Sequence, residues 1–224
     1  LNHCIFNFKV ISLIGLTNIY TPMKKLFILL LGFMVYTPAN SQIIKEIDQV
    51  SSFNEELAAI KKGDQWAFMD TEGKIVIDFR DDLVPVKNTT SEDKSPMFNN
   101  GRAMIRLTED KVTYYGYIDK TGKDVSLAEY VNATPFKDGF ALVMQYSKEV
   151  VGQNKLLGKD VVSYQIEEFV INPQGKAMTP MLNTRNYVPD KMKSGKVPAF
   201  TTVFLGNRMV GAQNADGQWE IYKF

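Results

Sequence analysis

The chain has 224 residues, so it is long enough for one domain with a buried core, the default at this length. Its 26 basic and 25 acidic residues nearly cancel, which argues against binding of nucleic acid or of an anionic membrane surface. The sequence contains one histidine, His3, and one cysteine, Cys4.

A signal peptide is predicted at residues 23–41. Met23 is followed by two lysines, an apolar run of eleven residues, and then small and polar residues suited to signal peptidase. The run is shorter than the about 20 residues of a membrane-spanning helix, and no cysteine follows it for lipid attachment. We therefore expect residues 1–22 to lie upstream of the translated protein. We expect residues 42–224 to be exported, to the periplasm or outside the cell, with no membrane span. A retained anchor and a buried helix are the alternatives.

The exported part, residues 42–224, lacks the residue types that most catalytic sites use. It has 183 residues, neither histidine nor cysteine, and a formal charge of −2, because residues 1–41 hold three lysines and no acidic residue. This composition excludes disulfides, serine–histidine–aspartate triads, thiol nucleophiles and zinc sites built from histidine or cysteine. No phosphate-binding loop or dinucleotide fingerprint is present. We expect a protein that is not an enzyme, with no catalytic, cofactor-binding or metal-binding residue and no cofactor.

Residues 43–62 fit two kinds of element. The segment is rich in glutamate, alanine and lysine, and its apolar residues are spaced as in a helix, at positions 43, 47, 50, 57 and 60. Comparison with the repeats described next indicates a strand from Phe53 to Ile60 instead. We favour the strand.

Two short patterns recur along the chain, always in the same order. The first is Phe-x-x-Gly-x-Ala-x-Val, and its copies begin at Phe53, Phe98, Phe136 and Phe204, the first with Glu56 in the glycine position. The second is aromatic-small-aromatic-apolar-Asp-x-x-Gly-Lys, and its copies begin at Trp66, Tyr115, Glu168 and, truncated by the chain end, Trp219. The constant order indicates diverged repeats, with units near residues 53–77, 98–127, 136–178 and 204–224.

Each second pattern is predicted to form a β-hairpin. In YGYIDKTGK, residues 115–123, neighbouring side chains point to opposite faces of a strand. Asp119 suits the first position of a type I turn, and Gly122 supplies the positive φ that closes the hairpin through a bulge. The same pair of residue types recurs as Asp70 with Gly73 and as Asn172 with Gly175. The first pattern is predicted to add a third strand, and such a small unit must bury its faces against its neighbours.

Three segments interrupt the units. Residues 80–97 are polar and rich in turn-forming residues, which predicts a mobile loop. Residues 144–171 are predicted to form two long strands joined near residues 152–160, an extended hairpin that projects from the third unit. Residues 179–203 contain three prolines and are expected to cross irregularly to the fourth unit.

The two patterns resemble the WG-repeat family. Its units combine Phe-x-x-Gly-x-Ala-x-Val with Trp-Gly-Tyr-Ile-Asp-x-x-Gly-Lys, and YYGYIDKTGKD and FKDGFALV are similar to these. The resemblance runs from Phe53 to Phe224 over two good and two degenerate units, with Ala67 in place of glycine and Glu168 in place of an aromatic residue. It implies an all-β repeat protein. Together with the predicted hairpins, we expect antiparallel units stacked in a short array, solenoid-like or like a partial propeller. The family is frequent among exported bacterial proteins and offers no catalytic residues to transfer.

The residues that could carry chemistry have structural explanations. The carboxylates of Asp81–Asp82 and Glu167–Glu168 are expected to be solvated, because neighbours in a strand point to opposite faces. Asp70 and Asp119 are explained by their turns, with calcium or ligand contact as the alternative. Five aromatic residues are expected to pack in the core, with a sugar-stacking surface as the alternative: Trp66, Tyr114, Tyr115, Tyr117 and Trp219.

Two functions fit the sequence. We favour an exported, non-catalytic binding or scaffold protein of the cell envelope, whose partner is a glycan or another protein. Residues 144–171 and 80–97 are the expected contact elements, because inserted segments vary most between units. The alternative is a carboxylate-dependent glycan hydrolase, which needs two carboxyl groups from different units about 5–10 Å apart in one cleft.

Overall fold

The computed structural model describes residues 44–87, 93–179, 182–188, 196–214 and 216–224. The chain divides into two parts, Leu1–Ile43 and Ile44–Phe224, and every described residue belongs to the second. The predicted signal peptide and the segment before it lie outside the described residues. Within the described ranges no helix is present, and hence none that is long and apolar enough to cross a membrane.

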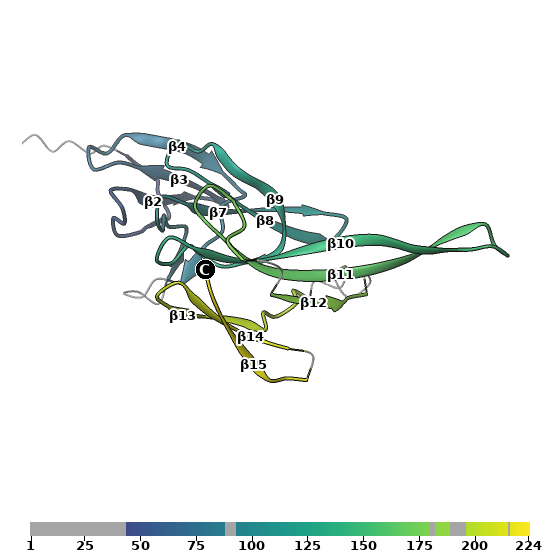
Figure 1. Cartoon of the computed structure of the whole chain (residues 1–224). Coiled ribbons are helices and arrows are strands. Elements are labelled where there is room, and N and C mark those ends of the chain that lie inside the picture. The colour runs from purple at the N-terminus through teal and green to yellow at the C-terminus, as the bar shows by residue number, and fades with distance from the viewer. Residues whose placement is uncertain (1–43, 88–92, 180–181, 189–195, 215) are drawn as a thin grey trace, which may run out of the picture. The chain divides into compact units, whose positions relative to one another are not determined.

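The described chain is all-β, and its strands pair antiparallel in four sheets (Figure 1). The first sheet contains, in order, β1 (Gln49–Val50), β2 (Ala58–Lys62), β3 (Gln65–Met69) and β4 (Ile75–Arg80). The largest, in the order β12-β11-β10-β9-β8-β7, contains β7 (Ala103–Glu109), β8 (Val112–Ile118), β9 (Asp124–Ala133), β10 (Ala141–Asn154), β11 (Lys159–Ile171) and β12 (Asn183–Asn186). The third contains β13 (Thr202–Gly206), β14 (Met209–Gln213) and β15 (Trp219–Lys223), and the smallest pairs β5 (Val86–Lys87) with β6 (Lys94–Ser95).

The predicted hairpin turn occurs four times with the same geometry. In each turn the side-chain Oδ1 of an Asp or Asn accepts the backbone N–H groups two and four residues ahead, at 2.8–3.1 Å. The glycine three residues after it has a φ of +76° to +82°. The acceptors are Asp70, Asp119, Asn172 and Asn214. The hairpin prediction is therefore confirmed, and a fourth copy is added.

That fourth copy corrects the prediction for the C-terminal end. Trp219 does not begin a truncated second pattern, because it opens the returning strand β15. The copy lies earlier, in β14 and the Asn214–Gly217 turn, and Phe204 lies inside β13 rather than ahead of a first strand. The fourth copy was missed because it has Val210 and Ala212 where the other hairpins have mostly aromatic residues.

The first pattern is a tight turn followed by a strand. Its second and third residues after Phe both have positive φ, at +49° and +70° for Glu55 and Glu56 and at +53° and +82° for Asp138 and Gly139. Two positive φ values are the signature of a type I′ turn. The strand predicted for residues 53–60 is confirmed only from Ala58 onward, as β2.

The strand pairs and turns form units that pack in series along the chain. We call them the first unit (residues 53–80), the second (98–133), the third (136–186) and the fourth (201–224). One buried cluster, with Phe68, Phe98 and Ile118, joins the first two units. A second cluster, with Tyr117 and Val143, joins the second and third. A further one joins the third and fourth units through Leu142, Val170, Val210 and Ala212.

The phenylalanine of the first pattern links each unit to the one before it. The ring centroids of Phe98 and Phe68 are 4.7 Å apart, and those of Phe136 and Tyr117 are 4.8 Å apart, both edge to face. In each pair the partner is the third residue of the preceding second pattern. Phe53 belongs to the first unit, and the described residues contain no unit before it. Its side chain is accordingly 50% exposed. The fixed order of the two patterns therefore has a packing cause.

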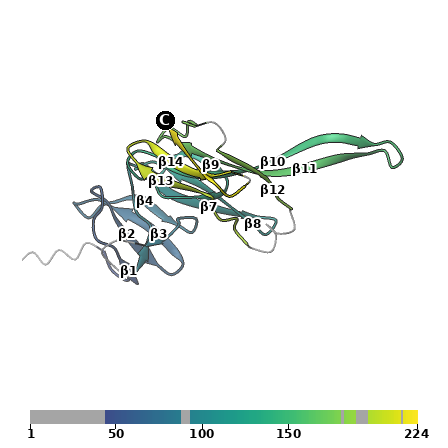
Figure 2. The same cartoon turned by 60° about the horizontal axis from the view of Figure 1, so that its bottom comes forward.

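The long hairpin prediction is confirmed, whereas the mobile loop prediction needs correction. Strands β10 and β11 pair over their full length, and in both Figure 1 and Figure 2 they extend as a ribbon beyond the other strands of residues 44–224. Within residues 80–97, in contrast, Leu83 is 1% exposed and Ser95 4% exposed, and Leu83 pairs with Ile105. Residues 88–92 of that segment lie outside the described residues.

Candidate functional site

Hydrogen bonds between the type I′ turns connect successive units. The carboxylate of Glu55, in the first turn, accepts the backbone N–H of Gly101 in the second turn at 2.8 Å. The Oδ1 of Asn100, in the second turn, accepts the backbone N–H of Gly139 in the third turn at 3.0 Å. Glu55 and Asn100 occupy the same turn position, so the contact repeats with the units.

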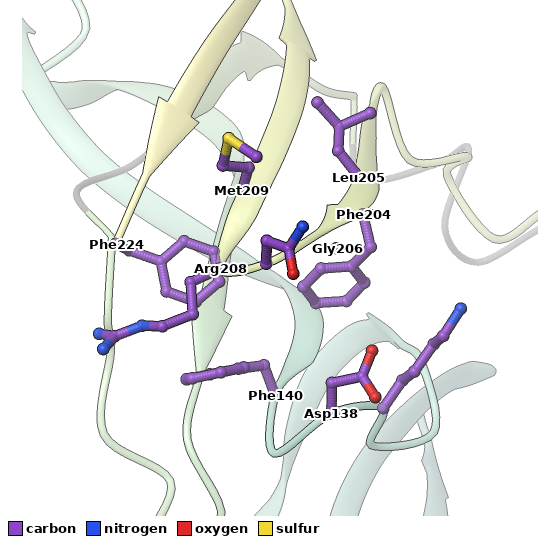
Figure 3. A pocket seen from close by; sticks show the side chains of 10 residues that line it. Asp138, Phe140, Phe204, Leu205, Gly206, Arg208, Met209 and Phe224 are labelled. Carbon is purple, nitrogen blue, oxygen red and sulfur yellow. The ribbon is translucent and has the colours of Figure 1, made fainter.

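A pocket of about 400 Å³ lies beside the third of these turns, and this is the candidate functional site. It is bounded by the third turn, by the end of β13 and the turn into β14, and by the C-terminal residue Phe224. In Figure 3, Asp138 and Phe140 face Leu205 and Met209 across the pocket. The lining residues are Lys137, Asp138, Phe140, Phe204, Leu205, Gly206, Asn207, Arg208, Met209 and Phe224.

Three half-buried phenyl rings give the pocket its apolar surface. Phe140 and Phe224 pack edge to face with their ring centroids 4.8 Å apart, and Phe204 lies between them and Leu205. The Arg208 guanidinium lies 5.8 Å from the Phe140 centroid and 6.0 Å from the Phe224 centroid, within the range of cation–π attraction. The rings come from β10's leading turn, from β13 and from the chain end, so the pocket depends on the packing of the fourth unit.

The polar groups of the pocket are suited to binding. Asp138 is its only carboxyl side chain, and no other described residue forms a hydrogen bond or ion pair with it. Lys137 and Arg208 add positive charge to the lining. No group of three or more His, Cys, Asp or Glu residues in the described part of the chain could hold a metal ion. The pocket can therefore offer apolar contact, one anionic acceptor and two cationic donors.

The carboxylate pairs considered from the sequence do not meet in this pocket. Asp81 is exposed, and Asp82 is bound by Arg80, with Nε–Oδ1 and Nη2–Oδ2 distances of 2.5 and 2.6 Å. This hydrogen-bonded pair raises the pKa of Arg80. Glu167 is half-buried, and its Oε1 lies 3.4 Å from the hydroxyl of Ser147.

Glu168 is not the solvated charge that the sequence predicted, because it is completely buried. Its carboxylate accepts hydrogen bonds from Arg185 Nη2 at 2.7 Å and from the Thr201 N–H and hydroxyl at 3.0–3.1 Å. It therefore holds β12 and the start of the fourth unit to β11. In the third unit, Glu168 therefore replaces the first aromatic residue of the second pattern with a buried, hydrogen-bonded carboxylate.

Asp70 and Asp119 lie in their turns, as predicted. The Thr121 hydroxyl donates to Asp119 Oδ1 at 2.6 Å, and this bond, with backbone N–H bonds, lowers the pKa of Asp119. Neither residue lines the pocket. Local hairpin geometry accounts for both carboxylates.

The aromatic residues divide between the core and the surface. Trp66 and Tyr117 are buried at 5% and 1% exposure, as predicted for core residues, and burial raises the pKa of Tyr117 well above its ordinary value. Tyr114 and Tyr115 are half-buried beside core clusters. The prediction is wrong for Trp219, which is 54% exposed. Its indole lies against Gly211, where an added Cβ would be 3.3 Å from the ring.

The sequence did not identify the pocket, and of its lining residues only Phe204 had been singled out, as the start of a first-pattern copy. Phe140 occupies the position after Gly139, which the first pattern leaves unspecified. Arg208 and Phe224 belong to neither pattern. A usable signal existed at Asp138, because the two preceding copies have Glu55 and Asn100, both hydrogen-bond acceptors, at the same position.

Comparison with known proteins identifies the repeat. The family model described as WG containing repeat matches residues 38–66 and 115–148. The second match begins at the second pattern of one unit and ends beyond the first pattern of the next, so it spans the contact between Tyr117 and Phe136. No curated protein and no solved structure matches the chain. The resemblance to WG repeats is thus confirmed at these two regions.

Proposed function

We propose that this protein is a non-catalytic, exported repeat protein with a binding role in the cell envelope, where its partner is a glycan or another protein. The observation that carries the proposal is the pocket beside the third turn. It combines three phenyl rings with one anionic and two cationic side chains, and its volume of about 400 Å³ lies in the range of ligand sites.

The chemistry of the pocket suits a ligand with an apolar face and hydrogen-bonding groups at its edge. The phenyl rings supply apolar contact, Asp138 accepts hydrogen bonds, and Lys137 and Arg208 donate them. Sugar rings and peptide segments both have this character. Export, which the sequence predicts, would place such a site among envelope glycans and proteins.

The ribbon of β10 and β11 supports a second contact surface. Its tip exposes apolar side chains, with Leu156 93% exposed and Leu157 66% exposed. Beyond Gln145 of β10 and Tyr164 of β11 the two strands pair only with each other, so both outer edges of the ribbon are free of strand partners among the described residues. Exposed apolar side chains on a projecting element mark an interaction surface.

The hydrolase alternative receives no support from the pocket. A glycosidase needs two carboxyl groups on either side of the bond that it cleaves. Asp138 is the only carboxyl side chain among the lining residues. Turnover of a glycan that is lost in Asp138→Asn would nevertheless restore that alternative.

Capture of partners from envelope extracts tests the proposal. Leu205→Asp places a charge in the pocket, and Leu107→Asp is the matched control, because the two leucines are 50% and 53% exposed. The full chain and Leu107→Asp should retain the same partner, and Leu205→Asp should lose it. A third variant without residues 146–163 tests the ribbon. Equal recovery by all four proteins would contradict both assigned surfaces.

A further inference from the structure

The pocket lies at the open end of the hydrogen-bond series between turns. In that series the second residue after each Phe supplies the acceptor, and the third residue after the next Phe supplies the backbone N–H. Glu55 binds Gly101 in this way, and Asn100 binds Gly139. The third acceptor position is Asp138. No Phe-x-x-Gly turn follows it, because the fourth unit begins without one.

Asp138 is prepared for the same contact. Its φ is +53°, against +49° for Glu55 and +53° for Asn100, so the three residues hold equivalent backbone conformations. Its side chain is exposed, lines the pocket and has no partner among the described residues. The first acceptor in the series, Glu55, shows that a carboxylate at this position takes a backbone N–H at 2.8 Å.

We propose that the pocket binds a peptide segment of a partner protein. A backbone N–H of the segment donates to the Asp138 carboxylate, and an apolar side chain lies among Phe140, Phe204 and Phe224. The proposal rests on the binding function assigned to this pocket above. It continues the hydrogen bond between turns that already occurs twice in the chain. In those two interfaces the incoming Phe packs on the third residue of the preceding second pattern. Val170 holds that position in the third unit and is buried against the fourth, so in the pocket the inserted side chain meets the three phenyl rings instead.

The arrangement of the rings favours a peptide over a glycan. A sugar stacks on the open face of an aromatic ring, whereas the Arg208 guanidinium already lies over Phe140 and Phe224. The existing contacts between units are edge to face, as for Phe68 with Phe98 and Tyr117 with Phe136. An inserted side chain can make that contact without displacing Arg208.

The probe for this site is a peptide with the sequence of residues 98–104, FNNGRAM, acetylated and amidated at its ends. These residues form the turn whose glycine N–H donates to a carboxylate in the chain. A second peptide carries N-methylglycine in place of the glycine and has no N–H to donate. Binding to the full chain is measured by NMR titration, which detects weak complexes.

Three variants identify the acceptor. Asp138→Gly removes the carboxylate while keeping the positive φ, and it should weaken binding about tenfold or more, as expected for loss of a hydrogen bond to a charged group. Asp138→Asn should bind within about threefold of the unchanged chain, because Asn100 serves as acceptor in the second turn. Asp110→Gly is the matched control at an exposed aspartate with a φ of +49°, and it should bind normally.

The outcomes separate this inference from the proposed function. Equal binding of the two peptides, or equal binding by the unchanged chain and Asp138→Gly, would overturn the hydrogen bond to Asp138. Binding of a soluble envelope glycan fragment at the pocket, with no binding of the peptide, would overturn the peptide while leaving a binding function in place. Binding of neither, together with unchanged partners for Leu205→Asp, would remove both.

Discussion

Single side-chain oxygens organise the four repeated hairpins. Asp119 Oδ1 accepts the N–H groups of Thr121 and Lys123 and the hydroxyl of Thr121, at 2.6–3.1 Å. Asn172 and Asn214 form the same backbone bonds without a charge. The turn therefore requires an oxygen at that position, and a charge is optional.

Replacing Asp119 separates these two contributions. Asp119→Ala removes the acceptor and should lower the free energy of unfolding by about 1–2 kcal/mol, whereas Asp119→Asn should cost less than half of that. Urea unfolding at neutral pH measures both. Equal losses in the two variants would show that the charge, rather than the oxygen, stabilises the turn.

The charge itself should appear as a pH dependence. Hydrogen bonds to the carboxylate lower the pKa of Asp119 in the folded chain below its ordinary value of 3.8. A lowered pKa contributes stability that is present above the unfolded pKa and is lost as pH falls through the folded one. The stability difference between the unchanged chain and Asp119→Asn should thus shrink below about pH 4.

At the residue scale, local chemistry could be predicted and distant partners could not. Asp119 and Gly122 act within one turn, so their roles follow from neighbouring residues alone. Glu168 is buried because Arg185 and Thr201, 17 and 33 residues further along, bring donors to it. The alternating side-chain directions along a single strand contain no information about partners from other segments. For this reason the sequence predicted a solvated carboxylate at Glu168.

At the scale of elements, the type I′ turns were mistaken for parts of strands. Asn100–Gly101 and Asp138–Gly139 have residue types that favour positive φ, but Glu55–Glu56 does not. The first turn is held by its position in the series, through the Glu55 carboxylate bound to Gly101 N–H and Asn54 Nδ2 bound to the Phe98 carbonyl at 2.6 Å. Its backbone conformation is thus enforced by tertiary contacts.

Replacing Glu56 tests this interpretation. Glu56 has a φ of +70° and is exposed, so Glu56→Gly should raise the free energy of unfolding by about 0.5–1 kcal/mol through relief of the left-handed conformation. The control is Glu72→Gly, in a turn where the glutamate φ is not positive, which should be neutral or destabilising. Thermal unfolding compares the two. A lower melting temperature for Glu56→Gly would contradict strain at this turn.

At the scale of the whole molecule, serial packing could be predicted from the repeats, but not the pocket. The order of the patterns implies neighbouring units, and three buried clusters join them in turn. The pocket forms where the regular series ends, because the fourth unit lacks the Phe-x-x-Gly turn and brings Phe204, Arg208 and Phe224 instead. Arg208 and Phe224 carry no repeat pattern, and Phe204 was assigned to a copy of the first pattern, so sequence comparison between units could not place the three together.

Serial packing also predicts that the two ends of the array unfold separately. Val210 is fully buried between the third and fourth units, so Val210→Ala should destabilise the fourth unit by about 2–3 kcal/mol.

The two tryptophans report on opposite ends, with Trp66 in the first unit and Trp219 in the fourth. Urea unfolding followed by fluorescence should show an earlier transition for Trp219, measured in a Trp66→Phe background, and little change for Trp66, measured in Trp219→Phe. Val143→Ala, the same change in the middle cluster, should lower both transitions. If Val210→Ala shifts both reporters equally, the units unfold as one cooperative body, and the energetic independence of the repeats is wrong.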